Sequence, residues 1–255
     1  MTICISAICT ERGEEQIVFA VDHMITTANG EFEHPIKKYE RINKSTIAMV
    51  AGDALLMQYF MDIENFDEDY KSLQNIIQNK FIEKRKEKVN REVLSPFCLE
   101  KNFIQKSLER PLNNLFVENI LIETLETKLN SAILLIGFKE DKALISEISD
   151  GNIYDFRTIN FHAIGSGAQQ AQNTLLFQKH SIENNLTTTI YNVFKAKKNS
   201  EVKQGVGKET EIGYLNKENV FMIDEKDINI LNNIYNTESS YGKTHKDLEK
   251  IKIRN

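Results

Sequence analysis

The sequence is poor in the residues that mark several classes of protein. Its 255 residues include no tryptophan, three prolines, three cysteines and eleven glycines. Collagen-like chains need glycine at every third position, disulfide-stabilised domains are rich in cysteine, and disordered chains are poor in apolar residues. Because 41% of the residues are hydrophobic and 27% are charged, the composition indicates an ordinary folded chain of one domain, or at most two.

The sequence also lacks a long apolar run and an excess of basic residues. No stretch approaches the roughly 18 to 20 apolar residues that span a bilayer. The formal net charge is -5, so the chain does not have the basic character of proteins that bind nucleic acid or anionic membranes. The apolar start has no preceding basic region and no cleavage site typical of a secretory signal. We therefore expect a cytoplasmic protein, with no nucleic acid and no membrane as partner.

The residues that bind metals and nucleotides show no recognisable spacing. Cys4, Cys9 and Cys98 form no CxxC pair, and the five histidines show neither HxxxH nor HExxH spacing. The glycine-containing turns at 165–167 and 207–209 lack the residues that would complete a dinucleotide-binding motif or a P-loop. We expect neither a metal nor a cofactor.

The hydrophobic pattern predicts strands, helices, strands, helices and strands, in that order. Short apolar or alternating segments bounded by turn residues predict strands over 2–10, 16–22, 37–42, 46–51, 132–138, 143–148, 153–158, 161–164, 211–215 and 220–224. Apolar residues at three- and four-residue spacing predict helices within 53–130, within 165–180 and over 188–198. This order favours an α+β fold with two antiparallel sheets over an alternating parallel fold.

The second residue is a threonine, and a small second residue permits removal of the initiator methionine. Without Met1, the amine of Thr2 could act as the general base for its own hydroxyl. A turn centred near Arg12 would pair residues whose numbers add to about 24, which predicts Asp22 opposite Thr2. Many chains begin with Met-Thr, and an aspartate that ends a strand is common at turns, so neither feature alone indicates a catalytic site.

A family resemblance rests on two segments, TICISAICTERGEEQIVFAVDHMITT and KKYERINKSTIAMVAGDALLMQ. They resemble a β-type proteasome subunit or its simpler bacterial relatives, which are N-terminal-nucleophile (Ntn) hydrolases. Lys38 follows Asp22 by 16 positions and Gly52 follows Lys38 by 14, which matches the family spacing of catalytic Asp, catalytic Lys and oxyanion glycine. The later segments GFKEDKALISEISDGNIYDF and AIGSGAQQAQNTL resemble the family's second sheet and its GSG turn. The likeness covers most of residues 2–225.

The resemblance implies a four-layer αββα sandwich of two antiparallel sheets flanked by helices. It implies a single domain over 1–234 with an enlarged helical region at about 53–130, followed by a polar C-terminal tail over 235–255. Homo-oligomerisation is also implied, with a ring as one form, together with a peptide or protein substrate and an unfoldase partner that the sequence does not identify.

The resemblance also implies a role for each matching residue. Thr2 would be the nucleophile, and Lys38 would place positive charge beside its hydroxyl and amine, which favours their deprotonated forms. Asp22 would orient Lys38, Gly52 would offer a backbone N–H to the oxyanion, and Ser166 would hydrogen-bond the amine-side network. Each residue alone also has an ordinary interpretation: Lys38 as an exposed strand lysine, Gly52 as a helix-start glycine and Ser166 as a helix N-cap.

Substrate contacts can be transferred in the same way. An extended peptide would pair as an added strand with the backbone of Thr26 and Ala54. The first specificity pocket of the family would draw here on aliphatic and polar residues, namely Ile25, Ile36, Glu40, Val50, Ala54 and Gln58. Glu40 at the pocket edge would favour a basic or polar substrate side chain, and a surface-facing Glu40 is an equally good interpretation.

One loop departs from the family pattern. The family has an Asp followed three residues later by a Ser, where this chain has Lys203 and Val206. The leading prediction is a threonine-type endopeptidase, a hydrolase that cleaves peptide amide bonds through an acyl-ester on Thr2. Two alternatives stay open: a catalytically silent proteasome-fold scaffold, which the departure favours, and an Ntn amidohydrolase acting on a small amide, for which the mixed pocket is suited.

Overall fold

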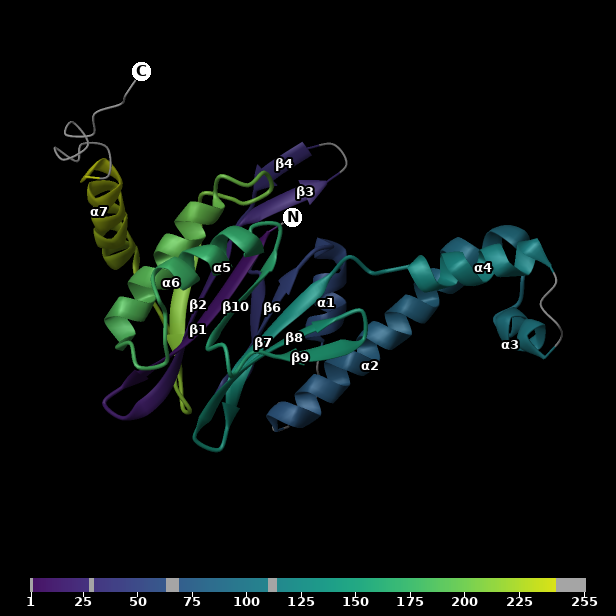
Figure 1. Cartoon of the computed structure of the whole chain (residues 1–255), viewed down its shortest axis with the longest axis horizontal. Helices are drawn as coiled ribbons and strands as arrows, with labels where there is room; N and C mark the ends of the chain where they lie inside the picture. The colour runs from purple at the N-terminus through teal and green to yellow at the C-terminus, as the bar shows by residue number, and fades with distance from the viewer. Residues whose placement is uncertain (1, 28–29, 63–68, 110–113, 242–255) are drawn as a thin grey trace, which may run out of the picture.

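Two antiparallel β-sheets form the centre of the molecule (Figure 1). The structure is a computed structural model that describes residues 2–27, 30–62, 69–109 and 114–241. The strands of the described chain are β1 (Ile3–Glu11), β2 (Glu14–Asp22), β3 (Met24–Thr27), β4 (Gly30–Glu33), β5 (Tyr39–Asn43), β6 (Thr46–Ala51), β7 (Ala132–Lys139), β8 (Lys142–Ser149), β9 (Asn152–Asp155), β10 (Phe161–Gly165), β11 (Thr210–Leu215) and β12 (Val220–Met222). One sheet has the order β10-β1-β2-β11-β12, the other has the order β5-β6-β7-β8-β9, and β3 and β4 form a separate hairpin.

The central strands are buried on both faces, which follows from their nearly continuous runs of apolar residues. Along β1, Cys4 and Ile8 lie in a core that also includes Met49 of the other sheet. The intervening residues Ile3 and Ile5 lie in a second core, on the outer side of the same sheet. Because successive side chains of a strand point to opposite faces, each central strand contributes to two cores.

Helices cover the outer faces of the two sheets. The helices of the described chain are α1 (Ala54–Met61), α2 (Tyr70–Val89), α3 (Phe103–Leu108), α4 (Leu115–Glu126), α5 (Ala168–Phe177), α6 (Leu186–Ser200) and α7 (Glu225–Tyr241). Helices α5 and α6 pack on the sheet that contains β1, through residues such as Leu175 and Phe194. Helix α2 packs on the other sheet through Leu73, Ile77 and Phe81. The expected mixed fold of antiparallel sheets and helices is therefore confirmed.

A helical arm extends from the end of α2 away from the sheets (Figure 1). Helix α2 continues into a π-helical turn over Asn90–Leu94, and a small core of Val93, Leu94 and Ile120 joins this turn to α4. Helix α4 presents large apolar side chains to solvent, among them Leu115 and Leu125, which are 71% and 72% exposed. Helices α1 to α4 all lie within the region in which the sequence predicts helices.

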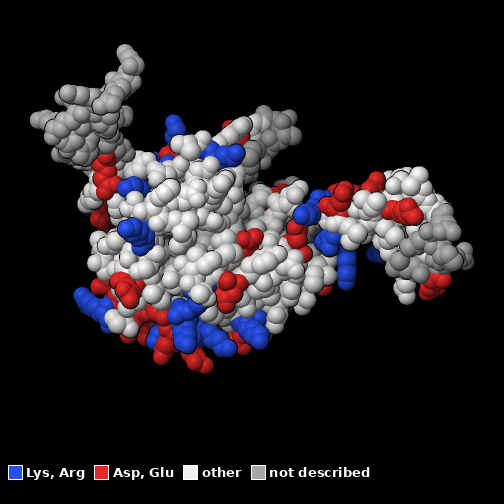
Figure 2. Space-filling model, viewed as in Figure 1, with Lys and Arg blue, Asp and Glu red and all other residues white. Residues whose placement is uncertain are grey.

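Charged side chains of both signs gather along one edge of the body, where several strand turns lie (Figure 2). Lys217 and Asp141 form an ion pair of 2.5 Å between two of these turns. The two signs are interspersed on the face shown, as expected for a solvated surface. Among the residues that the structure describes, no helix combines the length and apolar character needed to cross a membrane.

The predicted register of β1 and β2 is wrong by one residue. Paired residues have numbers that add to 25 rather than about 24, as Cys4 and Val21 show. The cause is the Arg-Gly turn at 12–13, in which both residues have positive φ, 53° and 84°. Two consecutive residues with positive φ are typical of a two-residue type I′ hairpin, which is centred between them. Asp22 is therefore displaced by one residue from the position opposite Thr2.

Two other segments differ from the sequence-based description. The hairpin of β3 and β4 lies in a region rich in turn residues, where no strand is predicted. Helix α7 runs from Glu225 to Tyr241 and thus crosses the predicted start of the polar tail at residue 235. The rest of that tail, 242–255, lies outside the described residues.

Candidate active site

Thr2 lies in a buried cluster of polar side chains. Its Oγ1 donates a hydrogen bond to Oδ1 of Asp22 and accepts one from Nζ of Lys38. The Lys38 ammonium also lies 2.7 Å from Oδ1 of Asp22 and donates to the carbonyl oxygen of Met24. The three protons of this ammonium group therefore have three acceptors, which a charged group needs when it is removed from water.

Asp22 ends β2 and is fully buried, with five hydrogen-bond donors around its carboxylate. Besides the side chains of Thr2 and Lys38, Oδ1 accepts the backbone N–H of Ile3 at 3.0 Å. Oδ2 accepts the N–H groups of Met24 and Gly207, at 3.3 Å and 2.7 Å. These donors replace the hydration that the carboxylate loses, and they fix its orientation toward Thr2.

Lys38 lies directly before β5 and points inward. The residue is 7% exposed, so its interpretation as an ordinary exposed strand lysine is wrong. Its carbonyl oxygen accepts the backbone N–H of Val50 at 2.9 Å, which ties this position to β6. The segment before β5 is thus held by the neighbouring strand while its side chain reaches Thr2.

Two glycines bring the backbone close to this cluster. Gly52, between β6 and α1, has a φ of +116°, and a Cβ atom there would lie 2.2 Å from the carbonyl oxygen of Asn130. Gly165, at the end of β10, has a φ of +102°, and a Cβ atom there would lie 2.2 Å from the carbonyl oxygen of Thr2. Both the backbone conformation and the close contact therefore require glycine.

Ser166 contacts Thr2 directly. Its Oγ donates to the carbonyl oxygen of Thr2 at 3.3 Å. The N-cap of α5 is Gly167, which has no side chain to cap the helix, so the interpretation of Ser166 as the N-cap is wrong. The structure thus brings three other proposed catalytic residues into direct contact with Thr2: Asp22, Lys38 and Ser166.

An open cavity of about 600 Å³ lies over this cluster. Thr2, Gly52 and Ser166 line it, together with residues that sequence reasoning missed: Asp53, Lys88, Asn130, Ser131 and Asp150. Strand pairing brings Asn130 and Ser131 to the site. Ala51 pairs with Ala132, which places the start of β7 beside Gly52. A predicted pairing of these two strands is the signal that could have identified Ser131.

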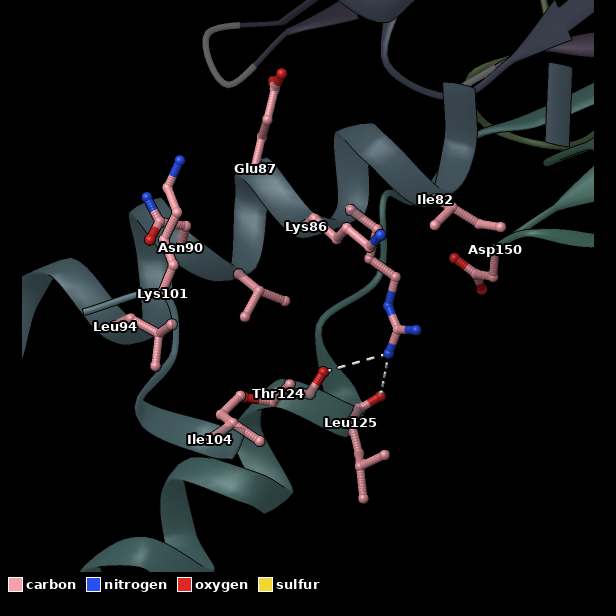
Figure 3. Close-up of a pocket in the computed structure, with 12 residues that line it drawn as sticks. Ile82, Lys86, Glu87, Asn90, Leu94, Lys101, Ile104, Thr124, Leu125 and Asp150 are labelled. Carbon is pink, nitrogen blue, oxygen red and sulfur yellow. Dashed lines mark hydrogen bonds between the residues drawn. The ribbon is translucent and has the colours of Figure 1, made fainter. Parts of the chain in front are cut away.

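A second hollow, of about 720 Å³, lies between α2 and the helical arm (Figure 3). Its lining includes Ile82, Leu94, Ile104 and Leu125, and a guanidinium of α2 donates to carbonyl oxygens of α4 at its edge. None of the proposed catalytic residues lines this hollow. Asp150, in the turn between β8 and β9, borders both hollows.

Two predicted substrate contacts concern backbone positions. Thr26 belongs to β3, where it pairs with Glu31 of β4, and β4 is the sole partner of β3 among the described strands. Ala54 is the first residue of α1, just after Gly52 and Asp53. The side chains of Thr26 and Ala54 are outside what the structure describes.

The side chains predicted to form the specificity pocket differ in burial. Val50 is 4% exposed and lies in the core beneath α2. Ile25 and Ile36 are half-buried, whereas Glu40 and Gln58 are exposed. The exposure of Glu40 agrees with the surface-facing interpretation of this residue.

A cysteine also lies near the cluster, and its surroundings argue against a thiol nucleophile. Cys4 is fully buried, and its Sγ lies 3.5 Å from the carbonyl oxygen of Val50. Burial is the largest effect and raises the pKa of the Cys4 thiol. The positive charge of Lys38 lowers this pKa by a smaller amount, and the negative charge of Asp22 raises it. Since the thiolate is the reactive form of cysteine, Cys4 is suited to packing rather than to attack.

The loop before β11 reaches the cluster through its backbone. Lys203 is exposed, and Val206 is buried in the core with α5 and α6, so neither offers a polar group to Thr2. The next residue, Gly207, donates its N–H to Asp22. The loop therefore contacts the cluster through the backbone of Gly207 and not through the side chains at 203 and 206.

A comparison with solved structures agrees with this fold, whereas two comparisons based on sequence find no match. No protein-family model matches the sequence, and no curated protein matches it. The structure is similar to a solved structure described as an Anbu (Gly-1) mutant from Hyphomicrobium sp. strain MC1, with a TM-score of 0.63 and 12% sequence identity over 100% of both chains. At this identity the likeness shows the fold alone, which is proteasome-like.

Proposed function

We propose that this protein is a threonine-type Ntn hydrolase that cleaves peptide amide bonds. The observation that supports the proposal best is the contact of Thr2 Oγ1 with the buried Lys38–Asp22 pair, beside an open cavity. A threonine hydroxyl has little nucleophilic strength unless a base or a nearby positive charge activates it. The cluster supplies the charge, and the amine of Thr2 would supply the base once Met1 is removed.

The reaction would proceed in two steps. In the first, Oγ1 of Thr2 attacks the substrate carbonyl carbon, its proton passes to the α-amine, and the departing amine takes up that proton. The backbone N–H of Gly52 would stabilise the oxyanion, and Lys38 would favour deprotonation of the hydroxyl and the amine. In the second step, water hydrolyses the acyl-ester and restores Thr2. Ser166 would hold the Thr2 backbone in place through its hydrogen bond to the carbonyl.

Substrate binding would use the free edge of the β3–β4 hairpin and the start of α1. An extended peptide that pairs with β3 would pass Thr26 and reach Ala54 beside Gly52. The residues transferred from the family pocket, apart from Val50 in the core beneath α2, would then lie around the side chain next to the cleaved bond.

We further propose that the chain forms a homo-oligomer with a four-layer αββα arrangement in each subunit. The cores between the sheets, and between each sheet and its helices, support the layer arrangement. Apolar side chains of α4, including Leu115, Ile122 and Leu125, are more than half exposed and would gain from burial against another copy. Light scattering of Leu125→Glu should then show smaller particles than the unchanged protein.

The proposal is tested by replacing the nucleophile. Thr2→Ala removes the hydroxyl and should abolish peptide hydrolysis, whereas Thr2→Ser keeps a hydroxyl and should retain part of it. Intact-mass analysis of each preparation shows whether Met1 has been removed. Undiminished hydrolysis by Thr2→Ala would refute the proposal.

The departure at Lys203 and Val206 favours one alternative, a scaffold without activity. Retention of Met1 in the mature chain would support it, because Thr2 would then have no free amine. An Ntn amidohydrolase is the other alternative. Hydrolysis of acylated small amines, with no cleavage of a peptide library, would select it.

A further inference from the structure

Helix α6 places a second lysine ammonium inside the protein. Lys197 is 0% exposed. It carries a charged group next to Val193 and Phe194, which belong to the apolar core. Its Nζ donates to Oε1 of Glu201 at 2.7 Å and to the carbonyl oxygens of Gly207 and Lys208 at 2.9 Å and 2.8 Å. The three donors of the ammonium group are thus matched by three acceptors, and two of these acceptors belong to one loop.

The same loop is held from its other side by Glu33 of β4. Oε1 of Glu33 accepts the N–H groups of Lys208 and Glu209. The N–H of Gly207 donates to Oδ2 of Asp22 at 2.7 Å. The backbone at 207–209 is therefore fixed by a buried cation on its carbonyls and by two carboxylates on its N–H groups.

Gly207 connects Lys197 to the proposed catalytic cluster. Its carbonyl oxygen accepts from Lys197, and its N–H donates to Asp22, which in turn contacts Thr2 and Lys38. This short chain of hydrogen bonds enters the cluster at Oδ2 of Asp22, on the side away from Thr2. Since Lys203 and Val206 supply no polar groups, the loop acts on the cluster through this backbone contact.

We propose that Lys197 is a positioning residue of the Thr2 site, because its ammonium fixes the 207–208 backbone that orients Asp22. The inference rests on the proposed hydrolase function. It assigns to a buried lysine of α6 the support of a loop in which the family pattern predicts an Asp and a Ser. Lys197 touches neither Thr2 nor the cavity, so its effect reaches the nucleophile through Gly207 and Asp22.

The protonation state of Lys197 makes this arrangement depend on pH. Burial lowers the pKa of Lys197 to about 8, while the Glu201 carboxylate acts in the opposite direction. Lys198 of the same helix also lowers the pKa, Asp22 of β2 raises it, and Glu33 faces the loop from β4. Above this pH the neutral amine keeps two protons for three acceptors and loses its ion pair. Activity should therefore decline as pH rises through about 8.

The test compares Lys197→Met and Glu201→Gln with a matched control on the same helix. Lys195 pairs with Glu238 of α7 at 2.7 Å, so Lys195→Met makes the same substitution and removes a more exposed ion pair that faces α7 instead of the loop. Each full-length variant is assayed for peptide hydrolysis from pH 6 to 10. Hydrogen–deuterium exchange of peptides covering 203–209 measures the loop independently of activity.

We expect Lys197→Met to lower kcat about 10- to 100-fold with little change in KM, since small displacements of catalytic groups have effects of this size. The decline in activity above pH 8 should disappear in Lys197→Met and move to lower pH in Glu201→Gln. Loop amides should exchange at least about tenfold faster in Lys197→Met, which corresponds to the loss of about one hydrogen bond. The Lys195→Met control should match the unchanged protein in every assay.

The outcomes separate this inference from the proposed function. A folded Lys197→Met variant with unchanged kcat and pH profile would overturn the positioning role. Should Lys197→Met fail to fold, an unshifted pH profile and unchanged loop exchange in Glu201→Gln would overturn it equally. If the unchanged protein hydrolyses no substrate but loop exchange rises in the variants, the proposed hydrolase fails, while the link from Lys197 to the loop stands.

Discussion

Replacement of Gly165 by alanine should damage the proposed site more than the rest of the fold. An added Cβ would lie 2.2 Å from the carbonyl oxygen of Thr2 and 2.9 Å from its carbonyl carbon. Ordinary contact begins near 3.4 Å, so Thr2 or β10 must move by about 1 Å. The positive φ of Gly165 adds about 1–2 kcal/mol for a residue with a side chain, and overpacking adds about 1–3 kcal/mol. We expect a total loss of about 2–5 kcal/mol in the free energy of unfolding.

The effect on activity should exceed the effect of instability. A displacement of about 1 Å in a catalytic group can lower the rate about 100-fold, so kcat/KM of folded Gly165→Ala should fall by that factor. Gly13→Ala is the control, because Gly13 also has positive φ but has no atom within 4 Å of the added Cβ. It should lose about 1–2 kcal/mol of stability and no activity.

Urea denaturation and peptide hydrolysis at a temperature where both variants are folded measure the two quantities. Wild-type activity in folded Gly165→Ala would refute the claim that the Thr2 backbone must stay where Gly165 holds it. Equal losses of activity in Gly13→Ala and Gly165→Ala would also refute it, because the contact with Thr2 would then have no special role.

Two further predictions concern ionised groups. Asp22→Asn leaves the buried ammonium of Lys38 without a counterion, so urea denaturation at pH 7 should show a loss of about 3–5 kcal/mol, and a change under 1 kcal/mol would contradict the described pair. The hydrogen bond from His162 is the largest cause that holds the pKa of Glu147 below its ordinary value of 4.5. Glu147 therefore stabilises the fold above that value and loses this contribution as pH falls through its lowered pKa. The stability difference between the unchanged protein and Glu147→Gln should shrink on acidification from pH 6 to pH 3, and a constant difference would contradict the assignment.

Sequence patterns predicted the sheets and the composition of the proposed cluster because strong physical signals underlie both. The short, nearly continuous apolar runs of β1 and β2 reflect burial on two faces, so the strands could be recognised without their partners. The spacing of Asp22, Lys38 and Gly52 supported their placement near Thr2, and the structure brings all four to one place. Each of these residues lies at or directly beside the end of a strand, where the chain direction is set by the sheet.

Other features had no sequence signal of their own. The β3–β4 hairpin has an exposed second strand, so its residues follow no hydrophobic alternation. The one-residue shift of β1 against β2 depends on the φ angles of residues 12–13 rather than on apolar pattern. Lys197 lies in an otherwise ordinary helix, and its burial becomes apparent only when the carbonyl groups of the 207–208 loop are placed against it.

The identity of the N-terminal residue and its reactivity test the central claim most directly. The protein is treated with an electrophile that requires both the amine and the hydroxyl of one N-terminal residue, and the modified peptide is identified by mass. We predict a chain that starts at Thr2 and carries the adduct there, with much slower modification in folded Lys38→Met. A mature chain that keeps Met1, or a folded chain with a free Thr2 amine that stays unmodified, would contradict the proposed nucleophile.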